Sequence, residues 1–332
     1  MIDTPAFVRR RRFTVVPAEG ELLQRILDAE HHASRASGLN RRAYAQFETA
    51  QMKTLWGREH RRRFALVGDG DALASATRYS LSGVLAGRAI RLCAIGDVLV
   101  NAGSDARHLA DQLIEGLVAA AAGDGHDLVL LVSRGAAQPE HDGFAPLPMS
   151  EVTLGIAQSR RGAPMTLIRG GEPRDWAAIV AMGRRRASPF RFHLDRDIDF
   201  LQHVIARQRL LAGLGRKGAR ELQFFIAEEG ITAAAYVVIS VVGETWTLEE
   251  CGDRDASGAR VGAILQALIA RQPAERRPEI RGWLPPGFLP PQVTILSTQP
   301  ATERIAVHLL NSAPETLALR ANDVLYWRSD CL

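Results

Sequence analysis

The stretch from residue 90 to residue 144 limits what this chain can fold into more than any other part of the sequence. Residues 91–100 form an apolar run that predicts a mostly buried strand. Residues 101–107 are rich in turn formers and N-cap residues, and apolar residues then recur at helical spacing over 109–118. A second apolar run at 128–132 predicts another buried strand. A strand that leads into a helix through small residues leaves several backbone N–H groups pointing one way. These groups and the helix dipole together form an anion site.

These residues resemble the acyl-CoA-binding core of the GCN5-related N-acetyltransferases (GNAT). In that family a loop of pattern (Gln/Arg)-x-x-Gly-x-(Gly/Ala) follows the strand and opens the helix. On this sequence the loop aligns as Asp105-Ala106-Arg107-His108-Leu109-Ala110. Val98-Leu99-Val100 matches the strand whose backbone pairs with pantetheine, and Gly143-Phe144 matches a turn that follows the second strand. The resemblance implies an acetyltransferase fold with acetyl-CoA as co-substrate.

Three positions depart from the family pattern. Asp105 stands where the family has Arg or Gln, and His108 stands where it has Gly. Pro139 stands where the family has an aromatic residue, often the tyrosine that donates a proton. The His108 side chain either blocks the close approach of a pyrophosphate to the backbone or donates a hydrogen bond to it, and both interpretations are open. The alternative for the whole stretch is an ordinary strand–helix–strand crossover without a phosphate site.

The cofactor-binding residues that the resemblance implies lie on the strand and in the loop after it: Val98, Leu99, Val100, Gly103, Asp105, Ala106, Arg107, His108, Leu109 and Ala110. Arg107 either contacts a phosphate from the helix start or is an ordinary surface side chain, and we favour the phosphate contact. The backbone of Leu99 or Val100 is expected to polarise the thioester carbonyl.

Acetyl transfer to an amine requires the loss of a proton from an ammonium group whose pKa is near ~10.4. Asp97 directly precedes the pantetheine-pairing segment and is the candidate that attracts the amine and accepts its proton. The alternative for Asp97 is a strand-edge carboxylate that caps a turn. His141 lies near the proton-donor position of the family and titrates in the range needed to protonate the leaving thiolate. Its alternative is a solvated loop histidine.

The order of predicted elements indicates an α/β protein of the α+β, mixed-sheet kind. A strand at 13–16, a helix over 22–27, a second helix from 41 to 56 and a hairpin around Gly68-Asp69-Gly70 precede the central stretch. The segment 151–156 is expected to be the last strand of the first domain. The same order recurs weakly after a polar, turn-forming segment at 159–164. We therefore predict two GNAT-like domains of the tandem type, 1–160 and 165–332, each a mostly antiparallel sheet flanked by helices.

Composition argues against several other classes of protein. No apolar run approaches the ~20 residues needed to span a bilayer, so no membrane association is expected. Cys93, Cys251 and Cys331 are isolated, without metal-ligand or disulfide spacing, which predicts a cytoplasmic protein without a bound metal. The net charge of +4, with acidic residues spread through the chain, does not favour nucleic acid as a partner.

The leading hypothesis is an N-acyltransferase that moves an acetyl group from acetyl-CoA to an amine acceptor, either a small molecule or a peptide. The first domain would bind acetyl-CoA. The second, degenerate domain would shape the acceptor pocket, because its candidate loop at 252–262 keeps the family spacing poorly and is interpreted as a polar loop before a helix. The alternative is a non-catalytic tandem GNAT-like module for ligand sensing or assembly, which the altered first loop supports. The oligomeric state is left open, a dimer included.

Overall fold

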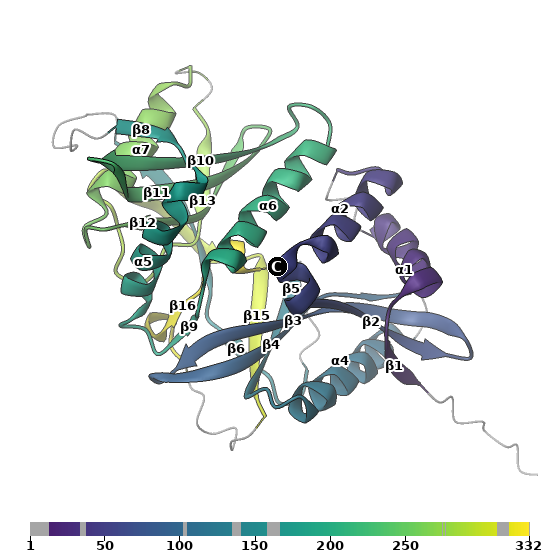
Figure 1. The fold of residues 1–332 in the computed structure, drawn as a ribbon. Coiled ribbons are helices and arrows are strands. Elements are labelled where there is room, and N and C mark those ends of the chain that lie inside the picture. Colours follow the sequence, from purple (N-terminus) through teal and green to yellow (C-terminus); the bar gives the residue numbers. More distant parts are fainter. Residues whose placement is uncertain are drawn as a thin grey trace, which may run out of the picture.

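The computed structural model describes residues 13–33, 38–101, 105–134, 141–157, 167–273, 275, 277–310 and 319–331. Its described strands form two sheets with helices on their faces (Figure 1). The first sheet has the strand order β1 (Thr14–Pro17), β2 (Arg61–Gly68), β3 (Asp71–Leu85), β4 (Arg88–Val100), β5 (Leu128–Arg134), β15 (Glu303–Leu309) and β6 (Ala145–Leu147). Two short strands extend it, because β9 (Phe192–Leu194) pairs with both β3 and β16 (Val324–Leu325).

The second sheet has the order β14 (Val293–Pro300), β7 (Ser150–Ile156), β13 (Glu279–Gly282), β12 (Thr245–Asp253), β11 (Thr232–Val242), β10 (Arg220–Glu229) and β8 (Leu167–Gly170). Parallel pairing occurs between β4 and β5, between β12 and β13, and between β9 and β16, and the other described pairs are antiparallel. The predicted fold class, with two mostly antiparallel mixed sheets flanked by helices, is confirmed.

The first sheet lies between two sets of helices. On one face, α4 (Ala106–Gly123) buries Leu113 and Leu117 against the sheet residues Ile95 and Leu131. On the opposite face lie α1 (Gly20–Ala33), α2 (Arg41–Lys53) and α3 (Leu55–His60) (Figure 1). A single helix was predicted from 41 to 56. It breaks at Thr54, whose hydroxyl accepts a hydrogen bond from the Gly57 amide at 2.9 Å and so caps a new helix.

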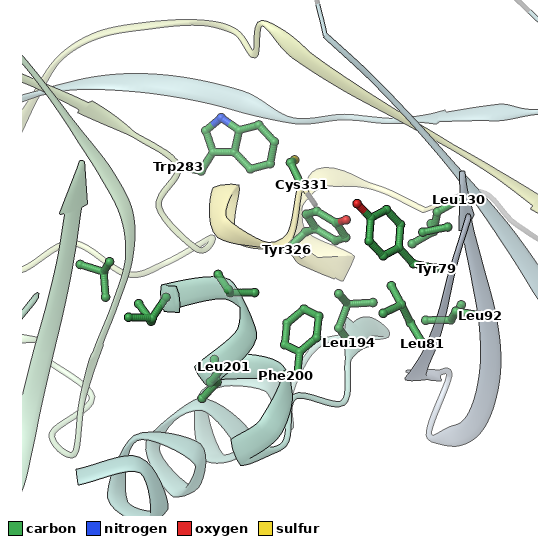
Figure 2. Close-up of a cluster of buried hydrophobic side chains, with 14 of the residues drawn as sticks. Tyr79, Leu81, Leu92, Leu130, Leu194, Phe200, Leu201, Trp283, Tyr326 and Cys331 are labelled. Carbon is green, nitrogen blue, oxygen red and sulfur yellow. The ribbon is translucent and has the colours of Figure 1, made fainter. Parts of the chain in front are cut away.

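The helices of the second sheet are α5 (Trp176–Ala187), α6 (Ile198–Leu214) and α7 (Ala259–Ala270), and the short 3-10 turns are η2 (Pro173–Asp175), η5 (Ala321–Asp323) and η6 (Arg328–Asp330). One hydrophobic cluster joins the two halves, as Figure 2 shows: Tyr79, Leu92 and Leu130 of the first sheet share it with Leu201 of α6 and with Trp283. Burial of this shared core holds α6 beside α3, whose Trp56 belongs to it, and a separate cluster that includes Phe47 and Leu211 packs α6 against α2.

The two halves exchange strands. The predicted strand at 151–156 exists as β7, but it pairs with β13 and β14 in the second sheet and not with strands of the first. Conversely, β15 comes late in the chain and lies between β5 and β6 in the first sheet. The sequence pattern identified the strand correctly and its sheet wrongly, because alternation of side chains does not specify a partner. The domain limits 1–160 and 165–332 stay a prediction.

Candidate active site

The first sheet opens where β4 and β5 separate. The two strands pair in parallel only from Leu92 with Leu128 to Ile95 with Leu131. Beyond Ile95, β4 continues to Val100 beside β3, without a partner on its β5 side among the described residues. The backbone groups of β4 that face this opening can therefore bind an extended ligand as an added strand would be bound.

A β-bulge lies at the start of the opening. The pairing of β3 with β4 shifts between Thr77, opposite Gly96, and Ser75, opposite Leu99. Asp97, inside the bulge, has a φ of 49°, while the other described non-glycine residues with positive φ, Asp69 and Ala86, lie in hairpin turns. A left-handed aspartate within a strand is strained, and such strain concentrates at functional sites. The bulge turns the Asp97 side chain towards the helices α1 and α2.

The Asp97 carboxylate is held from two sides. Its Oδ2 accepts a hydrogen bond from the Thr77 hydroxyl at 3.3 Å and lies 3.7 Å from Nη1 of Arg63. The Arg63 side chain is only 2% exposed, whereas that of Asp97 is 31% exposed. The accessible carboxylate is thus the outer end of a buried group of charges.

That buried group consists of the ion pairs Arg63–Glu30 and Arg61–Glu48, which join β2 to α1 and α2. Burial raises the pKa of Glu30 above its usual value, although Arg63 opposes the change. Burial acts in the same direction on Glu48, but Arg61 and Arg63 outweigh it and hold the Glu48 pKa below its usual value. Removal of any one of these four side chains would leave its partner as an uncompensated buried charge. The group of charges therefore fixes how α1 and α2 lie on the sheet.

The predicted phosphate loop lies at the start of α4. Asp105 is the N-cap and makes no side-chain hydrogen bond to the helix, and the first turn contains no acidic residue. Asp105, Ala106, Arg107 and His108 are exposed, and the His108 ring packs edge-on against Phe13 at 6.1 Å between centroids. Asp105 therefore stands at the helix start without filling it, because its carboxylate makes no capping hydrogen bond to the amides of the first turn. Gly103 and Pro139 lie outside the described residues.

The remaining predicted cofactor residues line the same region. Ala110 is buried, and Leu109 packs with Val98 and Val100 in the core under α4. Leu99 faces the other side of the sheet, where it lines a cavity of about 340 Å³ together with Ser75 and Arg25. The predicted strand and loop therefore meet at the open end of β4.

His141 lies on the α4 face of the sheet. Its Nδ1 is 3.0 Å from the carboxylate of Asp111 in α4, and its ring contacts Phe144 edge-on. The side chain is 9% exposed, so it is not a solvated loop histidine. Asp97 faces α1 and α2 on the opposite side of the sheet, and the structure does not bring the two candidate catalytic residues together.

The second sheet repeats this geometry. β12 pairs in parallel with β13 only over Thr245–Leu248 and continues to Asp253 with no described strand paired on that side. A bulge leaves Glu249 at the place that Asp97 occupies in the first sheet, and the Ser240 hydroxyl donates to Glu249 as Thr77 does to Asp97. Burial raises the pKa of Glu249.

The helix start in the second half differs, because a carboxylate of the chain fills it. Oδ2 of Asp253 accepts from the amide of Arg260 at 2.9 Å, and Oδ1 accepts from the amide of Asp255 at 2.9 Å and from Nη1 of Arg260 at 3.1 Å. A Cβ on Gly262 would lie 1.9 Å from Oε1 of Gln292, so another segment also packs against this helix. The start of α7 has neither the charge nor the room for a phosphate.

Sequence reasoning missed four of these residues: Arg63, Thr77, Ser133 and Asp253. The Ser133 hydroxyl is buried and has no hydrogen-bond partner within the described part of the chain. It lies two residues beyond the last β4–β5 pair and hence beside the opening. Arg61 and Arg63 are two residues apart on a strand, so both side chains lie on the same face of the sheet. This spacing was the one feature of the sequence that could have pointed to Arg63. Arginines on a strand are usually exposed, and their glutamate partners are far away in the chain.

These features define the GNAT fold: a central sheet split between two parallel strands, a bulge before the split, and a helix that starts at its end. Comparison of the sequence with protein-family models and with curated proteins finds no match. Comparison with solved structures shows the likeness. A GCN5-related N-acetyltransferase from Anabaena variabilis has a TM-score of 0.64 at 12% identity, over 90% of this chain and 73% of that one.

Two further solved structures share the arrangement. The N-myristoyltransferase of Saccharomyces cerevisiae, solved with bound myristoyl-CoA, has a TM-score of 0.54 at 11% identity, over 89% of this chain and 82% of that one. Eis1 from Mycobacterium abscessus has a TM-score of 0.53 at 16% identity, over 90% and 74% of the two chains. The chain thus has the fold of these proteins. In its described part, no helix combines the length and the apolar character needed to cross a membrane.

Proposed function

We propose that the chain is an N-acyltransferase that uses acyl-CoA, with acetyl-CoA as the donor, to acylate an amine. The observation that carries the proposal is the difference between the two halves. Both halves have a split between parallel strands, but the N-cap carboxylate of α4, Asp105, makes no hydrogen bond to its helix, whereas Asp253 binds the amides at the start of α7 in the second half. The fold neighbours, one of which was solved with myristoyl-CoA, support a CoA-type co-substrate.

Acyl-CoA would bind along the open side of β4. The pantetheine arm would pair with the backbone of Val98, Leu99 and Val100. The Ser133 hydroxyl, for which the described residues supply no partner, would add a hydrogen-bonding group on the β5 side. The pyrophosphate would lie at residues 103–110, where the helix N-terminus and Arg107 favour negative charge. The second half would then serve to shape the acceptor site.

The reaction requires the amine nitrogen to lose a proton and attack the thioester carbonyl. Asp97, which is partly exposed at the bulge, would attract the ammonium group and accept its proton. A backbone N–H of β4 would stabilise the oxyanion, and the C–S bond then breaks to release a thiolate. We assign protonation of this thiolate to His141, which Asp111 orients from α4. The acceptor, a small molecule or a peptide amine, would approach from the α1–α2 face.

A matched pair of variants tests this assignment in the full-length chain. Ala106 and Ala259 are the first residues of α4 and α7, so Ala106→Glu and Ala259→Glu place the same carboxylate at the two corresponding positions. Calorimetric titration with acetyl-CoA is expected to show one site per chain, with affinity at least about tenfold weaker in Ala106→Glu and unchanged in Ala259→Glu. The opposite pattern would place the cofactor in the second half.

The same titration separates the enzyme from the non-catalytic alternative. An acyltransferase binds acetyl-CoA and releases thiol when it is supplied with an acceptor from a panel of amines. A chain that neither binds acetyl-CoA nor gains thermal stability from it would be a non-catalytic module, since a ligand at 100 times its Kd adds about 2.7 kcal/mol of stability.

A further inference from the structure

Thr77 of β3 lies between the buried guanidinium of Arg63 and the partly exposed carboxylate of Asp97. It is fully buried, and its hydroxyl oxygen accepts a hydrogen bond from Nη1 of Arg63. The same hydroxyl donates to Oδ2 of Asp97 at 3.3 Å. The direct distance from Nη1 of Arg63 to Oδ2 of Asp97 is 3.7 Å, which is too long for a hydrogen bond. The hydroxyl is therefore the hydrogen-bonded link between the two charges.

The chemistry of the two charged groups fixes the direction of this link. A guanidinium has donors and no acceptor, and an ionised carboxylate has acceptors and no donor. The oxygen of Thr77 therefore accepts from Arg63, and its single proton is directed to Asp97. A hydrogen bond donated to a carboxylate favours the ionised form over the protonated form, and the charge of Arg63 strengthens it by polarising the hydroxyl.

Arg63 is held in place by α1 and α2. Its Nη2 pairs with Glu30 of α1, and its Nη1 also lies 3.8 Å from Glu48 of α2. The side chain is 2% exposed, so it has no room to turn towards water. The guanidinium thus presents a fixed N–H to Thr77, and one hydroxyl carries its influence to Asp97.

The bulge in β4 explains why such a link is needed. Asp97 has a left-handed backbone with a φ of 49°, which is strained for a residue other than glycine. It also lies where the pairing between β3 and β4 shifts, so the regular ladder does not fix its side chain. The hydrogen bond from Thr77 holds one carboxylate oxygen against the sheet, while the side chain as a whole remains 31% exposed.

The second half contains the same arrangement. Glu249 lies in the bulge of β12, and the Ser240 hydroxyl on the neighbouring strand β11 donates to it. A hydroxyl beside a bulge carboxylate therefore recurs at corresponding places in the two sheets. The two carboxylates differ in exposure, because the Glu249 side chain is 7% exposed. Of this pair, Asp97 is the carboxylate that a ligand can reach.

We propose that Thr77 is a positioning residue that relays the charge of Arg63 to Asp97 and holds the Asp97 carboxylate ionised and oriented for the acceptor amine. The proposal rests on the proposed function of Asp97 in acyl transfer. Thr77 does not touch the substrate, because it is fully buried. An ionised carboxylate is needed to attract an ammonium group and to accept its proton, so loss of the hydroxyl should reduce activity first at acidic pH.

Direct titration of Asp97 in the full chain tests the relay without an assay of activity. The carboxyl carbon of Asp97 is followed by carbon-13 NMR as the pH is changed, and its signal is identified by its loss in Asp97→Asn. Thr77→Val removes the hydroxyl and nearly keeps the shape of the side chain. Its Asp97 titration midpoint is expected to rise by at least about half a pH unit. Thr77→Ser retains the hydroxyl and is expected to keep the wild-type midpoint.

The comparison isolates the hydroxyl because the other groups around Asp97 are common to all the variants. The described titratable groups that act on Asp97 or on its ion-pair partners come from α1, α2 and β2: Glu30, Tyr44, Glu48, Arg61 and Arg63. Ser240→Ala is the matched control, because it removes the corresponding hydroxyl of the second half. It should leave the midpoint of Asp97 unchanged.

A smaller rise in Thr77→Val would overturn the proposal, as would an equal rise in Thr77→Ser or in Ser240→Ala. A purely structural role would lower the melting temperature and leave the midpoint unchanged. Should Thr77→Val not fold, Thr77→Ala removes the same hydroxyl without placing a methyl group beside Arg63, and the same criteria apply.

The pH dependence of kcat/KM with a verified acceptor supplies the second readout. Its acid limb should move in Thr77→Val by the same amount as the NMR midpoint, and an unmoved limb would reject the role of Thr77 in acyl transfer. The NMR titration requires neither acetyl-CoA nor an acceptor. A raised midpoint in a chain without acyl transfer would therefore refute the proposed function and retain the relay, whereas an unchanged midpoint in an active chain would refute the relay alone.

Discussion

The buried carboxylate Asp330 should make the stability of the protein depend on pH in an unusual direction. Burial raises the pKa of Asp330 to about 6 from the 3.8 of a solvated aspartate. The neighbouring Arg196 opposes this change, but Glu250 shares the same guanidinium, and the desolvation of a fully buried carboxylate outweighs the attraction. Because the folded state holds this proton more tightly than the unfolded chain does, ionised Asp330 destabilises the fold above pH 6.

The size of the effect follows from the two pKa values. The gap between 3.8 and about 6 corresponds to about 3 kcal/mol at 1.36 kcal/mol per unit. The penalty is present in full above pH 7 and shrinks as pH falls through 6 towards 4. About 2 kcal/mol of it should disappear between pH 7.5 and pH 4.5. Other carboxylates titrate in the same range, so the effect has to be measured as a difference between two proteins.

Urea unfolding of wild type and Asp330→Asn at several pH values isolates this difference. Relative to the variant, wild-type protein is expected to gain about 2 kcal/mol of stability between pH 7.5 and pH 4.5, since asparagine does not titrate. Asp142→Asn, which alters an exposed carboxylate, should show no such trend. A difference between wild type and Asp330→Asn that is constant with pH, or that grows in the opposite direction, would refute the reasoning.

Three further predictions concern the two helix starts and the bulge. Asp97→Asn should lose roughly 10²–10⁴-fold in turnover while keeping its affinity for acetyl-CoA. The loss should shrink as pH rises, because neutral amine becomes abundant. Unchanged turnover in steady-state kinetics with a verified acceptor would exclude Asp97 as the group that accepts the proton. His108→Gly should bind acetyl-CoA more tightly in calorimetry if the ring obstructs the loop, whereas weaker binding would identify His108 as a phosphate donor. Asp253→Ala should lower stability by about 1–3 kcal/mol in urea unfolding, because it leaves the part-buried amides of Arg260 and Asp255 without an acceptor. An unchanged midpoint would show that water replaces the carboxylate.

Local patterns in the sequence were enough to identify the elements of the first half. The apolar runs at 91–100 and 128–132 became β4 and β5, and the helical spacing between them became α4. These elements are recognisable because periodicity reports which face of a strand or helix is buried. The same information cannot say which sheet a strand joins, and this is why 151–156 was assigned to the wrong one.

The candidate site was only partly accessible to sequence reasoning for a related reason. Asp97 is identified by its place just before the open end of β4, but its left-handed backbone and its contact with Arg63 depend on tertiary structure. Arg63 is paired with Glu30, which is 33 residues away in the chain. Asp253 is one of many acidic residues in the sequence, and only the fold places it at the start of α7. Contacts between residues so far apart in the chain produce no periodic pattern in the sequence.

The exchanged strands also have a consequence for how the protein is made. On a ribosome, β5 and β6 emerge long before β15, the strand that lies between them in the finished sheet. Until residues 303–309 have been synthesised, the nascent chain keeps an incomplete sheet with an unpaired apolar edge at β5. Folding must therefore finish late and through contacts of long sequence separation, which slows it and exposes the growing chain to aggregation. A chain interrupted at a stop codon before β15 would contain every strand of the second sheet and would still lack the strand that joins β5 to β6 in the first.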